Sequence, residues 1–315
     1  MVKHKKTGAR FALKQFKKKA ASESSVEMMR SEAEVYLQVD HPHICRLMFV
    51  YEDKLSINLV MEHCSGGELY SRLVNSSTMR FSEDETKRAA VQMLLALQYL
   101  HAHNIVHRDL KLENWLYASR ETNAKLKLID FGFSKVVEPG VLMDLACGTL
   151  TYAAPELLGK AYTNTCDMWS FGVVVYILIV GRPPFEAKPD PTRASGRKDN
   201  GAIAHAIRHD RLRFKRPISD QAKDFIGRCL KRKVDDRMTA AVALEHPWLQ
   251  VKKDHVVKYK LEDDLFVALR GYAVANKVRR AACLLMAHTL SSSDVDDLAD
   301  AFLGIEGAQN GVITE

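Results

Sequence analysis

The sequence predicts an α+β protein built from two units, a small amino-terminal unit of strands with one helix and a larger, mostly helical unit. In the first unit, β-type runs at 10–16 and 56–61 lie on either side of a helical pattern at 25–39. In the second unit, apolar residues recur with helical spacing over 83–101 and 165–180. Strand patterns in this unit are confined to the stretch between those two helices, at 104–129.

Composition limits the class of protein. The chain has 315 residues, 47% of them hydrophobic, which is enough to bury a large core. Lys and Arg number 46 against 39 Asp and Glu, and the net charge of +7 fits nucleic acid, anionic lipid or phosphorylated ligands, or simply a solvated basic surface. The longest apolar run, 173–180, is far shorter than the roughly 20 residues of a membrane helix, and the first residues do not form a signal peptide.

Cysteine usage predicts the redox setting. No two cysteines form a C-x-x-C pair, so we expect neither a zinc site nor a disulfide framework. A reducing, cytoplasmic location fits best, and attachment to a membrane through an upstream segment stays open. The six positions are Cys45, Cys64, Cys147, Cys166, Cys229 and Cys283.

The strongest chemical signal is the segment His-Arg-Asp-Leu-Lys-Leu-Glu-Asn at 107–114. The Asp109 carboxylate can accept a proton from a substrate hydroxyl, and an amide five residues later, Asn114, can help hold a magnesium ion that bridges phosphates. Lys111 can neutralise charge on a transferring phosphoryl group. The segment resembles the protein kinase catalytic loop, H-R-D-L-x-x-x-N. The alternative is a buried Asp and Asn that only satisfy the backbone of a loop.

A second motif, Asp130-Phe131-Gly132, follows an apolar alternation that predicts a strand. In this register it resembles the kinase magnesium motif, in which Asp130 chelates the ion and Phe131 packs differently in active and inactive states. Further landmarks continue in kinase order. The resemblance implies that Thr149 lines the substrate pocket beside the catalytic aspartate, that Asp167 anchors the catalytic loop, and that Glu156 pairs with Arg237.

The amino-terminal unit contributes the remaining kinase landmarks. Phe-Ala-Leu-Lys at 11–14 resembles the strand whose lysine, here Lys14, holds the α- and β-phosphates of ATP. Glu32 in the predicted helix is the expected ion-pair partner of that lysine, and a solvated surface glutamate is the alternative. The resemblance also implies a nucleotide pocket with Met61 as gatekeeper, the Glu62 and Cys64 backbones for adenine, Ala12 and Leu116 around the ring, and Glu68 at the ribose.

The resemblance as a whole is to the protein kinase family. It implies a two-lobed α+β fold, with a partial small lobe at 1–63 and a helical large lobe at 64–249, and it implies ATP and Mg²⁺ as cofactors. The sequence around Lys111 resembles that of serine/threonine kinases, and Glu68 and Glu113 stand where members that prefer basic substrates hold substrate arginines. We therefore expect protein substrates with Arg or Lys upstream of the Ser or Thr, most often three residues before it, and no nucleic acid partner.

One departure concerns the amino terminus. The first residues resemble the end of the second kinase strand, and the G-x-G-x-x-G pattern that covers the phosphates does not precede Lys14. We therefore expect a truncated sequence, weak ATP binding and little phosphotransfer by these 315 residues alone. A scaffold that keeps the kinase fold without turnover is the alternative.

The carboxyl-terminal region predicts the subgroup. Residues 265–280 have the pattern of a basic amphipathic helix, and an acidic run follows at 290–298. The pattern alone allows a helix that binds a calmodulin-like lobe or one docked permanently on the large lobe. Together the two segments resemble the junction of calcium-dependent protein kinases, which implies an autoinhibitory helical junction at 250–290 and a partial first EF-hand at 291–315.

The start of that EF-hand has poor calcium ligands. Glu306 takes the first loop position in place of Asp, and Ala308 offers no side-chain oxygen at the third. We expect Ca²⁺ to act only through EF-hands outside this sequence, in an intramolecular calmodulin-like domain. The other reading is a calmodulin-dependent kinase with a separate calcium sensor.

Overall fold

The computed structural model describes residues 1–18, 22–136, 150–159, 163–187 and 200–250. The chain divides into two compact units, Met1–Gln250 and Val251–Glu315. All described residues belong to the first unit. The predicted junction and EF-hand segments therefore lie outside the described residues.

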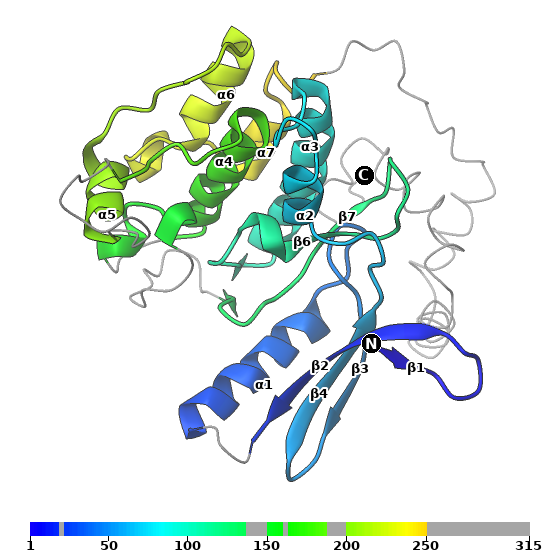
Figure 1. The fold of residues 1–315 in the computed structure, drawn as a ribbon. Helices are drawn as coiled ribbons and strands as arrows, with labels where there is room; N and C mark the ends of the chain where they lie inside the picture. Colours follow the sequence, from blue (N-terminus) through cyan, green and yellow to red (C-terminus); the bar gives the residue numbers. More distant parts are fainter. Residues whose placement is uncertain (19–21, 137–149, 160–162, 188–199, 251–315) are drawn as a thin grey trace, which may run out of the picture. The chain divides into compact units, whose positions relative to one another are not determined.

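A four-stranded antiparallel sheet forms the amino-terminal part, in the order β1-β2-β4-β3. Its strands are β1 (Val2–Lys3), β2 (Arg10–Lys17), β3 (Leu47–Glu52) and β4 (Ser56–Glu62). Helix α1 (Glu23–Gln38) packs against β3 and β4 (Figure 1). The sequence predicted β2, β4 and α1 to within two residues at each end, but it did not single out β3.

Helix α1 begins where its sequence provides a cap. The Ser22 hydroxyl accepts a hydrogen bond from the Ser25 amide at 3.3 Å, which satisfies one of the free amides of the first turn. One face of the helix then buries Glu32, Ala33 and Tyr36. A carboxylate on a buried helical face needs a cationic partner, so this face already marks the site.

The carboxyl-terminal part is helical, as predicted. The helix α4 is apolar around its whole circumference and is buried from its second residue to its last, which places it at the centre of this part. It contacts α3 and α6, and α3 also contacts α7 (Figure 1). The helices are α2 (Leu69–Val74), α3 (Glu83–Ala102), α4 (Thr165–Val180), α5 (Asn200–His209), α6 (Asp220–Cys229) and α7 (Ala240–Leu244).

Two short ribbons carry the loops between α3 and α4. Strand β5 (Ile105–Val106) pairs with β8 (Lys135–Val136), and β6 (Trp115–Tyr117) pairs with β7 (Leu126–Leu128). The loop of residues 107–114 begins where β5 ends, and the loop of residues 130–132 follows the end of β7. The two strand pairs therefore bring these loops side by side. Short 3₁₀ turns complete the described elements: Leu112–Asn114, Leu150–Tyr152, Leu157–Gly159 and Val234–Asp236.

Glu83 joins the start of α3 to the start of α6 and to the turn that follows α7. Its carboxylate accepts hydrogen bonds from the Ser219 amide at 2.8 Å, the Ser219 hydroxyl at 2.7 Å and the Trp248 indole at 3.0 Å. Partial burial favours the protonated carboxyl, but these donors outweigh it and hold the pKa of Glu83 below its ordinary value of 4.5. The ionised form therefore stabilises the fold.

A pH dependence follows from this lowered pKa. The Glu83 carboxylate contributes its full stabilisation at pH values above its pKa in the unfolded chain, near 4.5. This contribution is lost as the pH falls through the lower pKa that Glu83 has in the folded protein. We expect Glu83→Gln to cost about 1–2 kcal/mol at neutral pH, and this difference from the unmodified protein should shrink as the pH falls below about 4.5. Urea unfolding at a series of pH values measures the difference. The exposed Glu27→Gln variant is the control, and a difference for Glu83→Gln that is the same at every pH would contradict the assignment.

None of the helices in the described part of the chain combines the length and the apolar composition that crossing a bilayer requires.

Candidate active site

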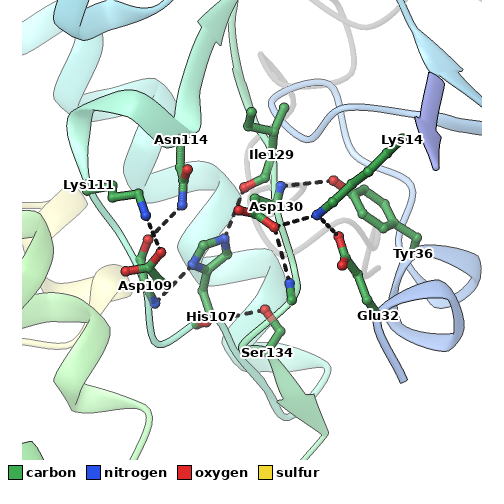
Figure 2. Close-up of polar contacts among 11 residues, drawn as sticks. Lys14, Glu32, Tyr36, His107, Asp109, Lys111, Asn114, Ile129, Asp130 and Ser134 are labelled. Atoms are coloured by element: carbon green, nitrogen blue, oxygen red, sulfur yellow. Dashed lines mark hydrogen bonds and ion pairs between the residues drawn. The ribbon is translucent and has the colours of Figure 1, made fainter. Parts of the chain in front are cut away.

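The catalytic-loop residues lie together at the carboxyl end of β5. Asp109 is only 4% exposed, and its carboxylate accepts a hydrogen bond from the Lys111 ammonium at 2.5 Å (Figure 2). The Asn114 side-chain amide donates to the Asp109 carbonyl at 2.8 Å. This bond uses the nitrogen of the Asn114 amide and leaves its oxygen available as a metal ligand.

Asp167 holds the backbone of this loop. Arg108 has a φ of 69°, in the left-handed region that a residue with a Cβ rarely adopts. The buried Asp167 carboxylate accepts from the Arg108 amide at 2.9 Å and from the His107 amide at 3.0 Å, and His101 pairs with it at 3.0 Å. These contacts offset the strain at Arg108 and fix the direction of the next side chain, Asp109.

His107 links the two functional loops. Its Nε2 lies 3.2 Å from the Ile129 carbonyl, which only accepts, so Nε2 carries the proton. Its Nδ1 therefore accepts from the Asp109 amide at 3.4 Å. Burial lowers the pKa of His107, and the neutral ring fits both contacts. Ser134 adds a bond from its hydroxyl to the His107 carbonyl at 3.3 Å.

Lys14 bridges the two parts of the site. From β2, its ammonium contacts Glu32 of α1 at 2.6 Å and Asp130 at 2.7 Å (Figure 2). Burial lowers the pKa of Lys14, but the two carboxylates outweigh it and the net pKa is raised, so the ammonium stays charged. Burial raises the pKa of Glu32 despite the ammonium, whereas the bond from Lys14 overcomes burial at Asp130 and lowers the pKa of that carboxyl.

The position of Asp130 depends on Tyr36, a residue that sequence reasoning did not find. Asp130 has a φ of 67°, and its amide donates to the Tyr36 hydroxyl at 3.0 Å. Phe131 is fully buried between the rings of Tyr36, at 4.7 Å, and His107, at 5.2 Å. Tyr36 lies four residues after Glu32 on the same face of α1, and that spacing is the one signal that could have identified it.

The predicted nucleotide-pocket residues lie in two neighbouring pairs. Ala12 stands opposite Met61 in the β2–β4 register, and Leu116 of β6 forms a bridge with Glu68 at the start of α2. The segment between the pairs contains Cys64, whose thiol raises the pKa of the Cys45 thiol.

The Glu62 backbone is partly committed. Its amide donates to the Arg46 carbonyl at 3.0 Å, and its carbonyl accepts a weak hydrogen bond from the Cys45 thiol at 3.7 Å. A carbonyl oxygen has two lone pairs, so it can still accept from a ligand. For the Cys64 amide, the described residues contain no backbone acceptor. The sequence predicted that the backbones of Glu62 and Cys64 hydrogen-bond to adenine. The groups that can do so are the Glu62 carbonyl, as acceptor, and the Cys64 amide, as donor.

Glu113 has an unusual environment. Its Oε2 is buried and has no hydrogen-bond partner in the described part of the chain. Together with burial, its charge raises the pKa of the neighbouring Tyr152. A buried, unpaired carboxylate oxygen is costly and favours a cation as its partner. Glu68, the other predicted substrate residue, is exposed. Thr149 lies outside the described residues.

Asn114 and Asp130 have oxygen donors that would suit a magnesium ion bound together with phosphates. Within the described residues, the Asn114 amide oxygen has no hydrogen-bond donor. At Asp130, Lys14 and the Gly132 amide, at 3.4 Å, both bind Oδ1, and the other carboxylate oxygen is left for the ion. Magnesium in such sites takes one or two protein oxygens, with phosphate and water completing the shell. Among the described residues there is no cluster of three or more His, Cys, Asp or Glu that could hold a metal without such a ligand.

Comparison with known proteins agrees with this arrangement. The protein kinase domain family matches residues 1–249, so the chain belongs to the protein kinase family. Among its relatives, calcium-dependent protein kinase 8 of Oryza sativa subsp. japonica is 35% identical over 314 residues, 98% of this chain and 56% of the relative. Calcium-dependent protein kinase 14 of Arabidopsis thaliana is 34% identical over 98% of this chain and 57% of its own length.

A third relative is named for calmodulin as well as for calcium. Calcium/calmodulin-dependent serine/threonine-protein kinase 1 of Oryza sativa subsp. japonica is 34% identical over 302 residues, 95% of this chain and 48% of the relative. The chain spans about half the length of the curated relatives it matches. Within the kinase family it is thus similar to the calcium-dependent protein kinases, as the sequence predicted.

Proposed function

We propose that the protein transfers the γ-phosphoryl group of ATP to serine or threonine hydroxyls of proteins. The observation that carries this proposal is the joining of Lys14, Glu32 and Asp130 in one ion-paired cluster, linked through His107 to the loop that presents Asp109. A phosphoryl transfer site needs this combination, because catalysis there is mostly positioning and charge stabilisation.

Each residue has a role in this proposal. Asp109 orients the substrate hydroxyl and accepts its proton, while Lys111, bonded to that carboxylate, neutralises charge on the transferring group. Asn114 and Asp130 would hold Mg²⁺, which supplies charge neutralisation between the phosphates when bound. Lys14 binds the α- and β-phosphate oxygens, and Glu32 keeps its ammonium in place.

The adenine and ribose are assigned to the segment after β4. We assign the edge of adenine to the Glu62 carbonyl and the Cys64 amide, its two faces to Ala12 and Leu116, the back of the pocket to Met61, and the ribose to Glu68. The register of Ala12 with Met61 and the bridge of Leu116 to Glu68 support this assignment.

Replacing Lys14 tests the nucleotide site. We expect Lys14→Met to weaken MgATP binding about 10- to 100-fold, because a charged donor to phosphate is lost and the Glu32 carboxylate stays buried without its cation. Calorimetric titration with MgATP measures the change. Lys17→Met, an exposed position on the same strand, is the matched control, and equal affinities of the two variants would refute the phosphate role of Lys14.

The unpaired oxygen of Glu113 supports a preference for basic substrates. We expect a peptide with Arg three residues before the Ser to be a better substrate than one with Glu there, because the guanidinium supplies the missing partner. Glu113→Gln should lower kcat/KM for the Arg peptide about tenfold and change it little for a peptide with Ala at that position. Exposed Glu121→Gln is the control. Equal turnover of acidic-flanked peptides would disprove the preference.

A more specific proposal is that calcium regulates the phosphotransfer. It is supported by the similarity to proteins named calcium-dependent and by the basic and acidic segments of residues 250–290 and 291–315. In the proposed arrangement a calmodulin-like domain of the same protein binds Ca²⁺ and relieves inhibition by the junction. The test measures phosphotransfer with and without Ca²⁺, in the presence and absence of purified calmodulin. If Ca²⁺ changes the rate only when calmodulin is added, the result would favour a kinase with calmodulin as a separate calcium sensor.

A further inference from the structure

A basic surface lies at the end of α5 and on the segment that follows it. Leu212 and Phe214 pack against the core, whereas the residues between and beside them are exposed. This alternation of buried and exposed positions is typical of extended backbone, so the side chains at 211, 213 and 215 share one side. We call the exposed cations of this surface the basic stripe: Arg208, Arg211, Arg213, Lys215 and Arg216.

Groups of the core hold the backbone of the stripe. The Tyr176 hydroxyl of α4 donates to the Arg213 carbonyl at 2.7 Å, and its ring lies 5.7 Å from that of Phe214. Arg232 donates to the Asp210 carbonyl. The backbone of the stripe is therefore positioned before any ligand arrives, which reduces the backbone entropy lost on binding.

Three members of the stripe, Arg211, Arg213 and Lys215, line a groove of about 720 Å³. Two carboxylates share the groove. Glu186 pairs with Lys215 at 2.9 Å. Burial lowers the pKa of Arg232, and the negative charge of Asp210 offsets part of this larger effect. In the described part of the chain, three guanidinium groups of the lining then remain for a ligand: Arg182, Arg211 and Arg213.

We propose that this groove binds an extended, acidic segment of a partner protein. Successive same-side positions of extended backbone are about 7 Å apart, so alternate carboxylates of such a segment match the spacing of Arg211 and Arg213. Guanidinium groups suit this ligand because they bind carboxylates with two parallel hydrogen bonds. The proposal goes beyond phosphotransfer and does not depend on it.

Two other polyanions fit the groove less well. Nucleic acid binding to single strands relies on exposed aromatic faces on which successive bases stack. Of the lining rings, Phe185 is only 4% exposed, which leaves His209 as the one exposed ring that the described lining offers. A membrane surface is broad and reaches protruding cations, whereas these arginines line a recess together with carboxylates. A narrow chain of alternating side chains satisfies both the recess and the charges.

Binding of a defined probe tests the proposal. The probe is a fluorescein-labelled dodecapeptide of alternating Glu and Ser, and its anisotropy is measured with the full chain at low and moderate salt. We expect saturable binding that weakens with salt, and at least about tenfold weaker binding to the double variant Arg211→Glu/Arg213→Glu. The conservative variant Arg211→Lys/Arg213→Lys should retain most of the affinity.

The control variant has the same change in net charge, but at positions outside the groove. The double variant Lys54→Glu/Arg120→Glu alters two exposed cations outside the groove and should bind the probe nearly as well as the unmodified chain. An equal loss in both double variants would show attraction by net charge alone and overturn the proposal. Absence of peptide binding, with or without charge-dependent binding to phosphatidylserine vesicles, would also overturn it.

Discussion

Asp109→Asn is expected to reduce phosphotransfer about 10²- to 10⁴-fold, the range that a positioned general base contributes. Asparagine has the size of aspartate and can still accept one hydrogen bond from Lys111, but it cannot take a proton from the substrate hydroxyl. The loop should keep its shape because its backbone is held by Asp167, at 2.9 Å and 3.0 Å, rather than by the Asp109 side chain. The measurements are kcat with a Ser peptide and, on the same samples, MgATP affinity.

The comparison separates catalysis from folding. Asp235→Asn removes one negative charge from an exposed position and should leave turnover unchanged. The Asp109→Asn variant should retain nearly all of its MgATP affinity, because the proposed phosphate and metal contacts belong to Lys14, Asn114 and Asp130. Turnover close to that of the unmodified protein would exclude Asp109 as the base, whereas loss of both turnover and nucleotide affinity would indicate a structural role.

The elements that the sequence predicted well carry their signal locally. Helix α4 was predicted at 165–180 and spans those residues, since sixteen largely apolar residues in one run have few other ways to be buried. The catalytic loop was found because its chemistry lies within eight consecutive residues. The Lys14–Glu32 contact was inferred from family resemblance, and the structure contains it.

What sequence reasoning missed depends on contacts between distant segments. The bond from the Asp130 amide to Tyr36 joins residues 94 positions apart, and neither residue type signals it. The left-handed backbone at Arg108 and Asp130 goes against the usual preference of residues with a Cβ, so local propensity predicts the wrong conformation there. Such exceptions are expected at functional sites, where surrounding contacts offset the strain.

Arg237→Met is expected to cost about 3–5 kcal/mol in the free energy of unfolding, the largest stability effect we predict. The Arg237 side chain has no exposed surface, and it binds Glu156 through two hydrogen bonds of 2.5 Å and 2.9 Å. It also donates to the Thr165 and Lys231 carbonyls, both at 2.9 Å. Methionine fills part of the volume but leaves a carboxylate and two carbonyls without their donor. Urea unfolding measures the loss.

A double variant shows whether the cost arises from the orphaned charge. Arg237→Met combined with Glu156→Leu removes both ions, so only the two carbonyls lose a partner, and the double variant should be more stable than Arg237→Met alone. The alternative is that the destabilisation of the double variant equals the sum of the destabilisations of the two single variants. In that case the coupling energy of the pair is zero and the cost comes from packing. Because Arg237 also lies 5.3 Å from the ring of Trp169 in α4, a purely additive result would assign its role to that contact.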